Sequence, residues 1–206
     1  MTELGAHAIA PPTGVGRAFL SPQRHVQQLE VSVEYNGIVV YDPLTVRDYY
    51  GGDVREGENL FARYTTTDEG DAVLAAGLIV PVLAIDDAGY EVVVRMAGER
   101  HPFDDHVVHR NHGFALRVTR RALVTDLYSL IDWSAPASAE YAELDLAPGT
   151  YRVDVDAFSR YVPGEGIVAA GYLFTFTPRP MLPPVEADAG AYMRVLDQPS
   201  GEASPA

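Results

Sequence analysis

The densest group of side chains that could do chemistry lies between residues 101 and 112, which hold four of the six histidines together with two aspartates. Imidazole nitrogens and carboxylate oxygens are ligands that zinc, iron and manganese accept. A catalytic metal site needs three of them converging, with one coordination position open. One hypothesis for this segment is therefore a site for a divalent metal such as zinc. Its candidate ligands are His101, Asp104, His106, His109 and His112.

The spacing of these residues works against a simple metal site. In a strand, His106 and His109 point to opposite faces, because side chains alternate with a period of two. In a helix those two histidines share a face, but His112 drifts away from it, and the pair of valines at 107 and 108 favours a strand. Only a loop would bring the ligands together. The competing interpretation is a polar surface loop.

Other catalytic signatures are missing from the chain. It has no cysteine, and all of its basic residues are arginine, which excludes thiolate nucleophiles, cysteine-ligated zinc, Schiff-base lysines and the P-loop lysine. It has no Gly-x-Ser-x-Gly, His-Glu-x-x-His or Gly-x-Gly-x-x-Gly motif. Asp154 and Asp156 share one face of a predicted strand, where carboxylates are ordinarily solvated. The sequence thus leans against an enzyme and predicts no catalytic residue and no organic cofactor.

The charge of the chain indicates what kind of partner it attracts. Its 206 residues include 29 acidic and 15 basic side chains, for a net charge of −14. Such a field repels the phosphate backbone of nucleic acids and attracts cationic proteins over long range. We expect a cationic protein partner and no direct nucleic-acid ligand. The first residues lack the basic and apolar regions of a signal peptide, and the apolar run at 72–85 is too short to cross a membrane, so the sequence predicts a cytoplasmic protein without a membrane span.

The elements that must position these residues read mainly as β-strands. Apolar residues alternate with polar ones over 29–35, 90–96, 114–118, 144–155 and 172–177. Turn residues follow or precede several of these runs, and three of them predict β-hairpins: Asn36-Gly37, the segment 86–89, and Pro148-Gly149. Pro81 interrupts an apolar run, so that strand should lie at a sheet edge or bulge. Residues 42–71 predict a long loop, and residues 123–131 fit either a strand or a short helix.

These patterns together predict an all-β protein, an antiparallel β-sandwich or jelly roll with at most one short helix. The length and the apolar content of 47% suit one core. We expect a mobile N-terminal arm over residues 1–27, a β-sandwich domain over 28–178 and a proline-rich C-terminal tail over 179–206. Trp133, the single tryptophan, is predicted to lie in the core.

Three segments carry a resemblance to a known family. They are the strand at 29–35 (LEVSVEY), the run at 144–153 (LDLAPGTYRV) and the strand at 171–176 (GYLFTF). With them the chain resembles the competence protein J group, bacterial inhibitors of a secreted or membrane-associated nuclease, and related immunity proteins. The resemblance implies a binding function in which an acidic surface blocks the cationic substrate groove of a nuclease or toxin. It transfers no functional residue to a position in this chain.

Three functions therefore compete. The leading hypothesis is a non-catalytic acidic binding protein, an inhibitor or immunity protein that neutralises a nuclease or toxin. The second is a metal-binding protein or metal-dependent enzyme that uses the segment from His101 to His112. The third is a structural or assembly subunit, with the proline-rich ends as docking arms.

Overall fold

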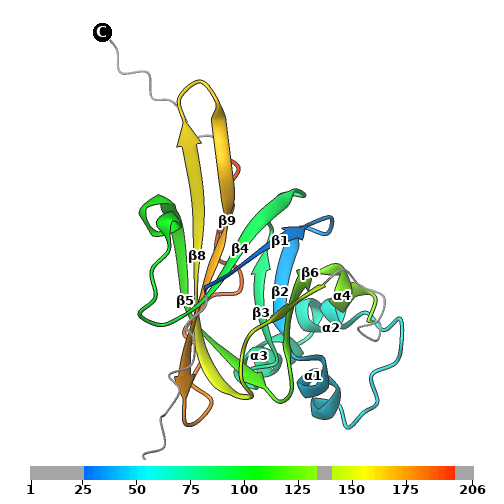
Figure 1. The fold of residues 1–206 in the computed structure, drawn as a ribbon. Coiled ribbons are helices and arrows are strands. Elements are labelled where there is room, and N and C mark those ends of the chain that lie inside the picture. The colour runs from blue at the N-terminus through cyan, green and yellow to red at the C-terminus, as the bar shows by residue number, and fades with distance from the viewer. Residues whose placement is uncertain (1–25, 134–140, 198–206) are drawn as a thin grey trace, which may run out of the picture.

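The computed structural model describes residues 26–133 and 141–197, which form two β-sheets and several short helices (Figure 1). The strands are β1 (Gln27–Ser32), β2 (Gly37–Tyr41), β3 (Ile79–Leu83), β4 (Gly89–Met96), β5 (Val107–Val118), β6 (Ala122–Asp126), β7 (Tyr141–Leu144), β8 (Gly149–Val162) and β9 (Gly166–Arg179). The helices are α1 (Pro43–Tyr49), α2 (Leu60–Thr66), α3 (Glu69–Ala75), α4 (Tyr128–Ile131) and the 3₁₀ helix η1 (Pro102–His106). The expected N-terminal arm over 1–27 lies almost entirely outside the described residues.

The two sheets share one apolar core. The larger sheet has the order β1-β4-β9-β8-β5 and the smaller sheet has the order β3-β2-β6-β7. Alternate residues of both sheets face this core, among them Val92 and Val94 from β4, Phe174 from β9, and Ile38 and Val40 from β2. The alternation in the sequence therefore marks which face of each strand is buried, as period-two patterning predicts.

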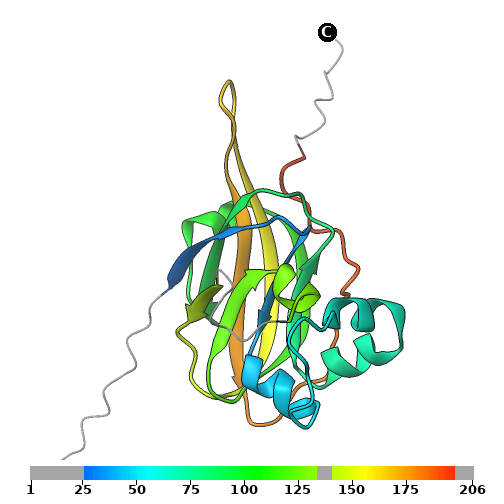
Figure 2. The same cartoon turned by 90° about the vertical axis from the view of Figure 1, so that its right-hand side faces the viewer.

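Further apolar clusters cover the outer faces of both sheets. Val39 and Tyr41 point away from the shared core and pack with residues of α1–α4, which lie against the smaller sheet (Figures 1 and 2). Because β2 is buried on both faces, its sequence is continuously apolar. On the larger sheet, Phe103 of η1 packs against Phe158 with ring centroids 4.1 Å apart. Each sheet therefore has the shared core on one face and a second apolar cluster on the other.

Three of the expected hairpins are wrong, although the expected strands and turns around them are present. The turn at Asn36-Gly37 connects β1 of the larger sheet to β2 of the smaller one. The turn at 86–89 and the turn at Pro148-Gly149 also carry the chain from the smaller sheet to the larger. One strand pair, β4 with β9, is parallel, so the larger sheet is mixed rather than purely antiparallel. Alternation and turn residues specify strands and reversals, but they do not specify which strand is the neighbour.

The expectation of at most one short helix is also wrong. The region 42–71, predicted as a loop, contains α1, α2 and the start of α3. Asp42 caps α1 by accepting a hydrogen bond from the Leu44 N–H, and Pro43 occupies the first turn. Asn59 caps α2 in the same manner through the Ala62 N–H. These are ordinary helix-start signals, which the glycine-rich and acidic composition of the region obscured.

Several smaller expectations are confirmed. Pro81 lies in β3, an edge strand, and Trp133 is buried. The ambiguous segment contains both elements, strand β6 followed by helix α4. Apart from these confirmed points, the segment expected as a proline-rich tail contains Met193 and Val195, which are buried in the shared core. Among the described residues, no helix is long and apolar enough to cross a membrane.

Candidate functional site

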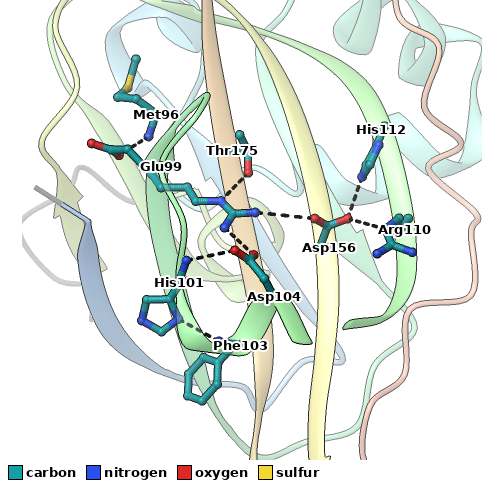
Figure 3. Close-up of polar contacts among 10 residues, drawn as sticks. Met96, Glu99, His101, Phe103, Asp104, Arg110, His112, Asp156 and Thr175 are labelled. Atoms are coloured by element: carbon teal, nitrogen blue, oxygen red, sulfur yellow. Dashed lines mark hydrogen bonds and ion pairs between the residues drawn. The ribbon is translucent and has the colours of Figure 1, made fainter. Parts of the chain in front are cut away.

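The segment from His101 to His112 forms η1 and the first half of β5, on the outer face of the larger sheet (Figure 3). His101 precedes η1, and its Nδ1 accepts a hydrogen bond from the Phe103 N–H at 3.4 Å. Asp104 accepts a hydrogen bond from the His101 N–H at 3.0 Å. These two contacts form a capping box, in which each side chain satisfies a backbone donor at the start of the helix. Both residues therefore have a structural task here.

Arg95 of β4 lies at the centre of a polar network on this face. Its side chain is buried to 8% exposure, its Nε donates to Thr175 Oγ1 at 2.8 Å, and Nη1 donates to Asp104 Oδ1 at 2.5 Å. Its Nη2 lies 3.8 Å from Asp156 Oδ2. A buried guanidinium is stable only when it is paired and hydrogen-bonded, and this one has both kinds of partner. The network joins η1 to strands β4, β8 and β9.

Of the other histidines, His112 and His109 contact different partners. His112 Nε2 lies 2.6 Å from Asp156 Oδ1, which also has Arg110 Nε at 3.7 Å. The ring of His109 contacts the Tyr192 ring edge to face, with centroids 5.2 Å apart. His106 is the last residue of η1. Figure 3 shows His101 and His112 at opposite ends of the network.

The predicted metal ligands are thus distributed rather than gathered. Within residues 26–133 and 141–197, no group of three or more histidine, aspartate or glutamate side chains is placed to hold a metal ion. The zinc hypothesis remains a prediction from the sequence, which metal analysis of untagged protein can test. A depression of about 390 Å³ beside the network is lined in part by Arg95, Glu99 and Arg110. Arg95 already pairs there with both Asp104 and Asp156, so this arrangement serves to hold η1 against the sheet.

Sequence reasoning did not identify Arg95, Asp156 or Thr175 as parts of one network. The three residues lie on β4, β8 and β9, and the register places Arg95 opposite Thr175 and Asp156 opposite Leu173. The available signal was an arginine in the otherwise apolar run of β4, where an unpaired charge would be costly. Its partners could be found only after the pairing of β4 with β9 was known.

His101 makes the stability of the fold depend on pH. Burial lowers the pKa of His101 below its ordinary value of 6.5, because desolvation disfavours the charged ring. The unfolded chain therefore binds the proton more readily, so the contribution is complete above pH 6.5 and declines as the pH falls. We expect the urea midpoint to fall between pH 7 and pH 5, with a loss in the free energy of unfolding no larger than the value of a helix cap, about 1 kcal/mol.

The matched variant for this pH dependence is His101→Asn, since asparagine caps a helix without titrating. Its midpoint should fall less than that of the wild type over the same pH interval. Other titrating groups are common to both proteins and cancel in the comparison. Equal pH slopes for the two proteins would show that the His101 cap does not contribute.

The excess negative charge lies mainly away from this network. Among the described residues, many exposed carboxylates have no ion pair with a described arginine or histidine: Glu30, Glu34, Asp48, Asp53, Glu56, Asp68, Asp71, Asp87, Asp105, Asp145, Glu165, Asp188 and Asp197. Several of them border the helices α1–α3 and the turns that connect the two sheets. Exposed arginines occur on β5 and the turn after it, at Arg110, Arg117 and Arg120, and also beside the acidic helices, at Arg47 and Arg55. Among the described residues, exposed carboxylates nevertheless outnumber exposed arginines.

Two solved structures are similar to this chain. One is described as ComJ from Bacillus subtilis, an inhibitor of the DNA degrading activity of NucA, with 13% identity, coverage of 76% of this chain and 99% of that chain, and a TM-score of 0.47. The other is described as Crocagin biosynthetic gene J, with 11% identity, coverage of 76% and 98%, and a TM-score of 0.45. No protein-family model and no curated protein matches the sequence.

Proposed function

We propose that this protein is a non-catalytic binding protein of the inhibitor or immunity kind, in which a β-sandwich scaffold presents an acidic surface to a cationic protein such as a nuclease or toxin. The observation that carries the proposal is the set of exposed carboxylates without cationic partners, in a chain of net charge −14. Carboxylates left unpaired on a folded surface are free to bind the arginines and lysines of a partner.

A nuclease is the first partner class to test for two reasons. A nuclease that degrades DNA must hold a polyanion, so the groove that binds its substrate is lined with positive charge. An acidic protein that covers this groove competes with the substrate directly. The similar ComJ structure is described as an inhibitor of a DNA-degrading activity, which makes the same class of partner the natural starting point.

The test begins by identifying the products of the genes beside the gene for this protein, and any nuclease or toxin among them is purified for binding assays. We expect a one-to-one complex that protects DNA from degradation or neutralises the toxin. Raising the salt from 50 to 300 mM should weaken the affinity at least about tenfold, chiefly through slower association, because steering between exposed charges is screened. A 30-base-pair DNA duplex should show no binding to the protein at either salt concentration.

Two results would contradict the proposal. One is a neighbouring nuclease or toxin that forms no complex and keeps its full activity in the presence of the protein. The other is a complex whose affinity does not change with salt, since the exposed carboxylates would then have no part in it. Binding of the DNA duplex itself would point to a different function.

A further inference from the structure

Two exposed tyrosines stack on each other where the chain passes from the larger sheet to the smaller. Tyr35, in the turn between β1 and β2, and Tyr128, the first residue of α4, have ring centroids 4.7 Å apart and an interplanar angle of 29°. Their exposures are 41% and 42%. The two segments that form the stack are more than ninety residues apart in sequence. Large aromatic side chains held rigidly at a surface are typical of the central contacts of protein interfaces.

A single carboxylate fixes the position of this pair. Asp126 Oδ2 accepts hydrogen bonds from the backbone N–H groups of Glu34 at 2.7 Å and Tyr35 at 3.1 Å. Asp126 Oδ1 accepts one from the Tyr128 N–H at 2.6 Å. The backbone of both tyrosines is therefore tied to one side chain. An aromatic stack fixed in advance binds a partner with a smaller loss of conformational entropy.

The surroundings of the stack are acidic. The Tyr128 hydroxyl donates to Asp132 Oδ2 at 2.8 Å, and Glu34 is exposed beside Tyr35. Asp87 accepts hydrogen bonds from the backbone and side chain of Asn36, the next residue in the turn. Arg194 pairs with Asp86, the residue before Asp87, at 3.5 Å. The rings therefore sit in a field that attracts positive charge.

We infer that the Tyr35–Tyr128 stack, together with Glu34 and Asp132, is a docking patch for an arginine side chain on a basic protein partner. This inference rests on the proposed function and adds the place of contact and the residue type that it recognises. A guanidinium is planar and weakly hydrated, so it stacks on an aromatic face and also pairs with a carboxylate. An ammonium group forms the ion pair but lacks the flat face. The patch accordingly favours arginine over lysine.

The experiment compares two small probes, the blocked peptides hexa-arginine and hexa-lysine, titrated into ¹⁵N-labelled protein at 50 mM salt and followed by NMR. Hexa-arginine should bind about twofold more tightly than hexa-lysine, because a guanidinium stacks flat on the ring while it pairs with a carboxylate. The amide signals of Glu34, Tyr35 and Tyr128 should be among those that move most. The Y35A/Y128A variant should bind the two peptides with equal affinity.

The control is Tyr161→Ala, which removes a tyrosine of similar exposure, 45%, from the far end of β8. It should keep the preference for arginine in full. If Y35A/Y128A is unstable, Tyr35→Leu tests the same patch with a larger apolar side chain. This variant is also expected to reduce the preference for arginine.

The possible outcomes separate this inference from the proposed function. Equal binding of both peptides by the wild type, or a preference that persists in Y35A/Y128A, overturns the docking patch and leaves the acidic inhibitor proposal standing. Absence of binding of either peptide at 50 mM salt overturns both. A preference that Tyr161→Ala abolishes would place the arginine contact at the end of the β8–β9 hairpin instead.

Discussion

Replacing Asp42 with alanine should destabilise the protein by about 4 kcal/mol, because it leaves several buried backbone donors without partners at once. The Asp42 side chain is fully buried, and its Oδ1 accepts the Leu44 N–H that begins α1. Its Oδ2 accepts the N–H groups of Thr119 and Arg120 at 2.7 Å each, and that of Arg121 at 3.3 Å. The carboxylate thus joins helix α1 to the turn between β5 and β6.

The measurement is thermal unfolding by circular dichroism, where a loss of this size lowers the Tm by about 10 °C in a chain of this length. Asp42→Asn retains one acceptor oxygen and should recover part of the loss. Asp48→Ala removes an exposed carboxylate in the same helix and should change the free energy of unfolding by less than about 0.5 kcal/mol. A Tm for Asp42→Ala within 2 °C of the wild type would contradict the role assigned to Asp42.

The sequence predicted strands well and their pairing poorly, for a reason that the turn at Asn36-Gly37 illustrates. Asn36 adopts a positive φ of 55°, as the turn signal suggests. The strands on either side nevertheless pair with β4 in one sheet and with β3 and β6 in the other. A local turn motif fixes the reversal of the chain, whereas the choice of neighbour depends on contacts between distant segments. The parallel pairing of β4 with β9 is a long-range choice of the same kind.

In the candidate site, too, local sequence predicted less than contacts between segments that are distant in the chain. The histidine segment, expected as a surface loop if it held no metal, forms η1 and the first half of β5. Its side chains are directed by residues on other strands, such as Asp156 for His112. The docking patch follows this rule too. Tyr35 and Tyr128 are unremarkable in sequence, and they meet because Asp126 holds the backbone of both. Net charge, by contrast, is a property of composition, so the value of −14 could be read from the sequence directly.

The second large effect is expected at Gly171, where β9 begins to pair with β4. A Cβ atom at this position would lie 1.8 Å from the Glu91 carbonyl oxygen and 2.7 Å from its carbonyl carbon. Both atoms belong to the backbone of the neighbouring strand, so no side-chain rotation can relieve the overlap. Gly171→Ala should therefore force β4 and β9 apart in the middle of the larger sheet. We expect a loss of at least about 3 kcal/mol, at the upper end of what overpacking costs.

Gly149→Ala is the matched control, since Gly149 also lies in a strand and its φ is not positive. A Cβ atom there would approach the Tyr151 ring to 3.7 Å, which is an ordinary contact. Urea unfolding of the two variants should show a much lower midpoint for Gly171→Ala and little change for Gly149→Ala. If both variants unfolded at the wild-type midpoint, β4 and β9 would have to be farther apart at Glu91 than the structure places them. The close approach of these two backbones requires glycine at position 171. The parallel pairing of β4 with β9, in the centre of the larger sheet, therefore depends on this residue.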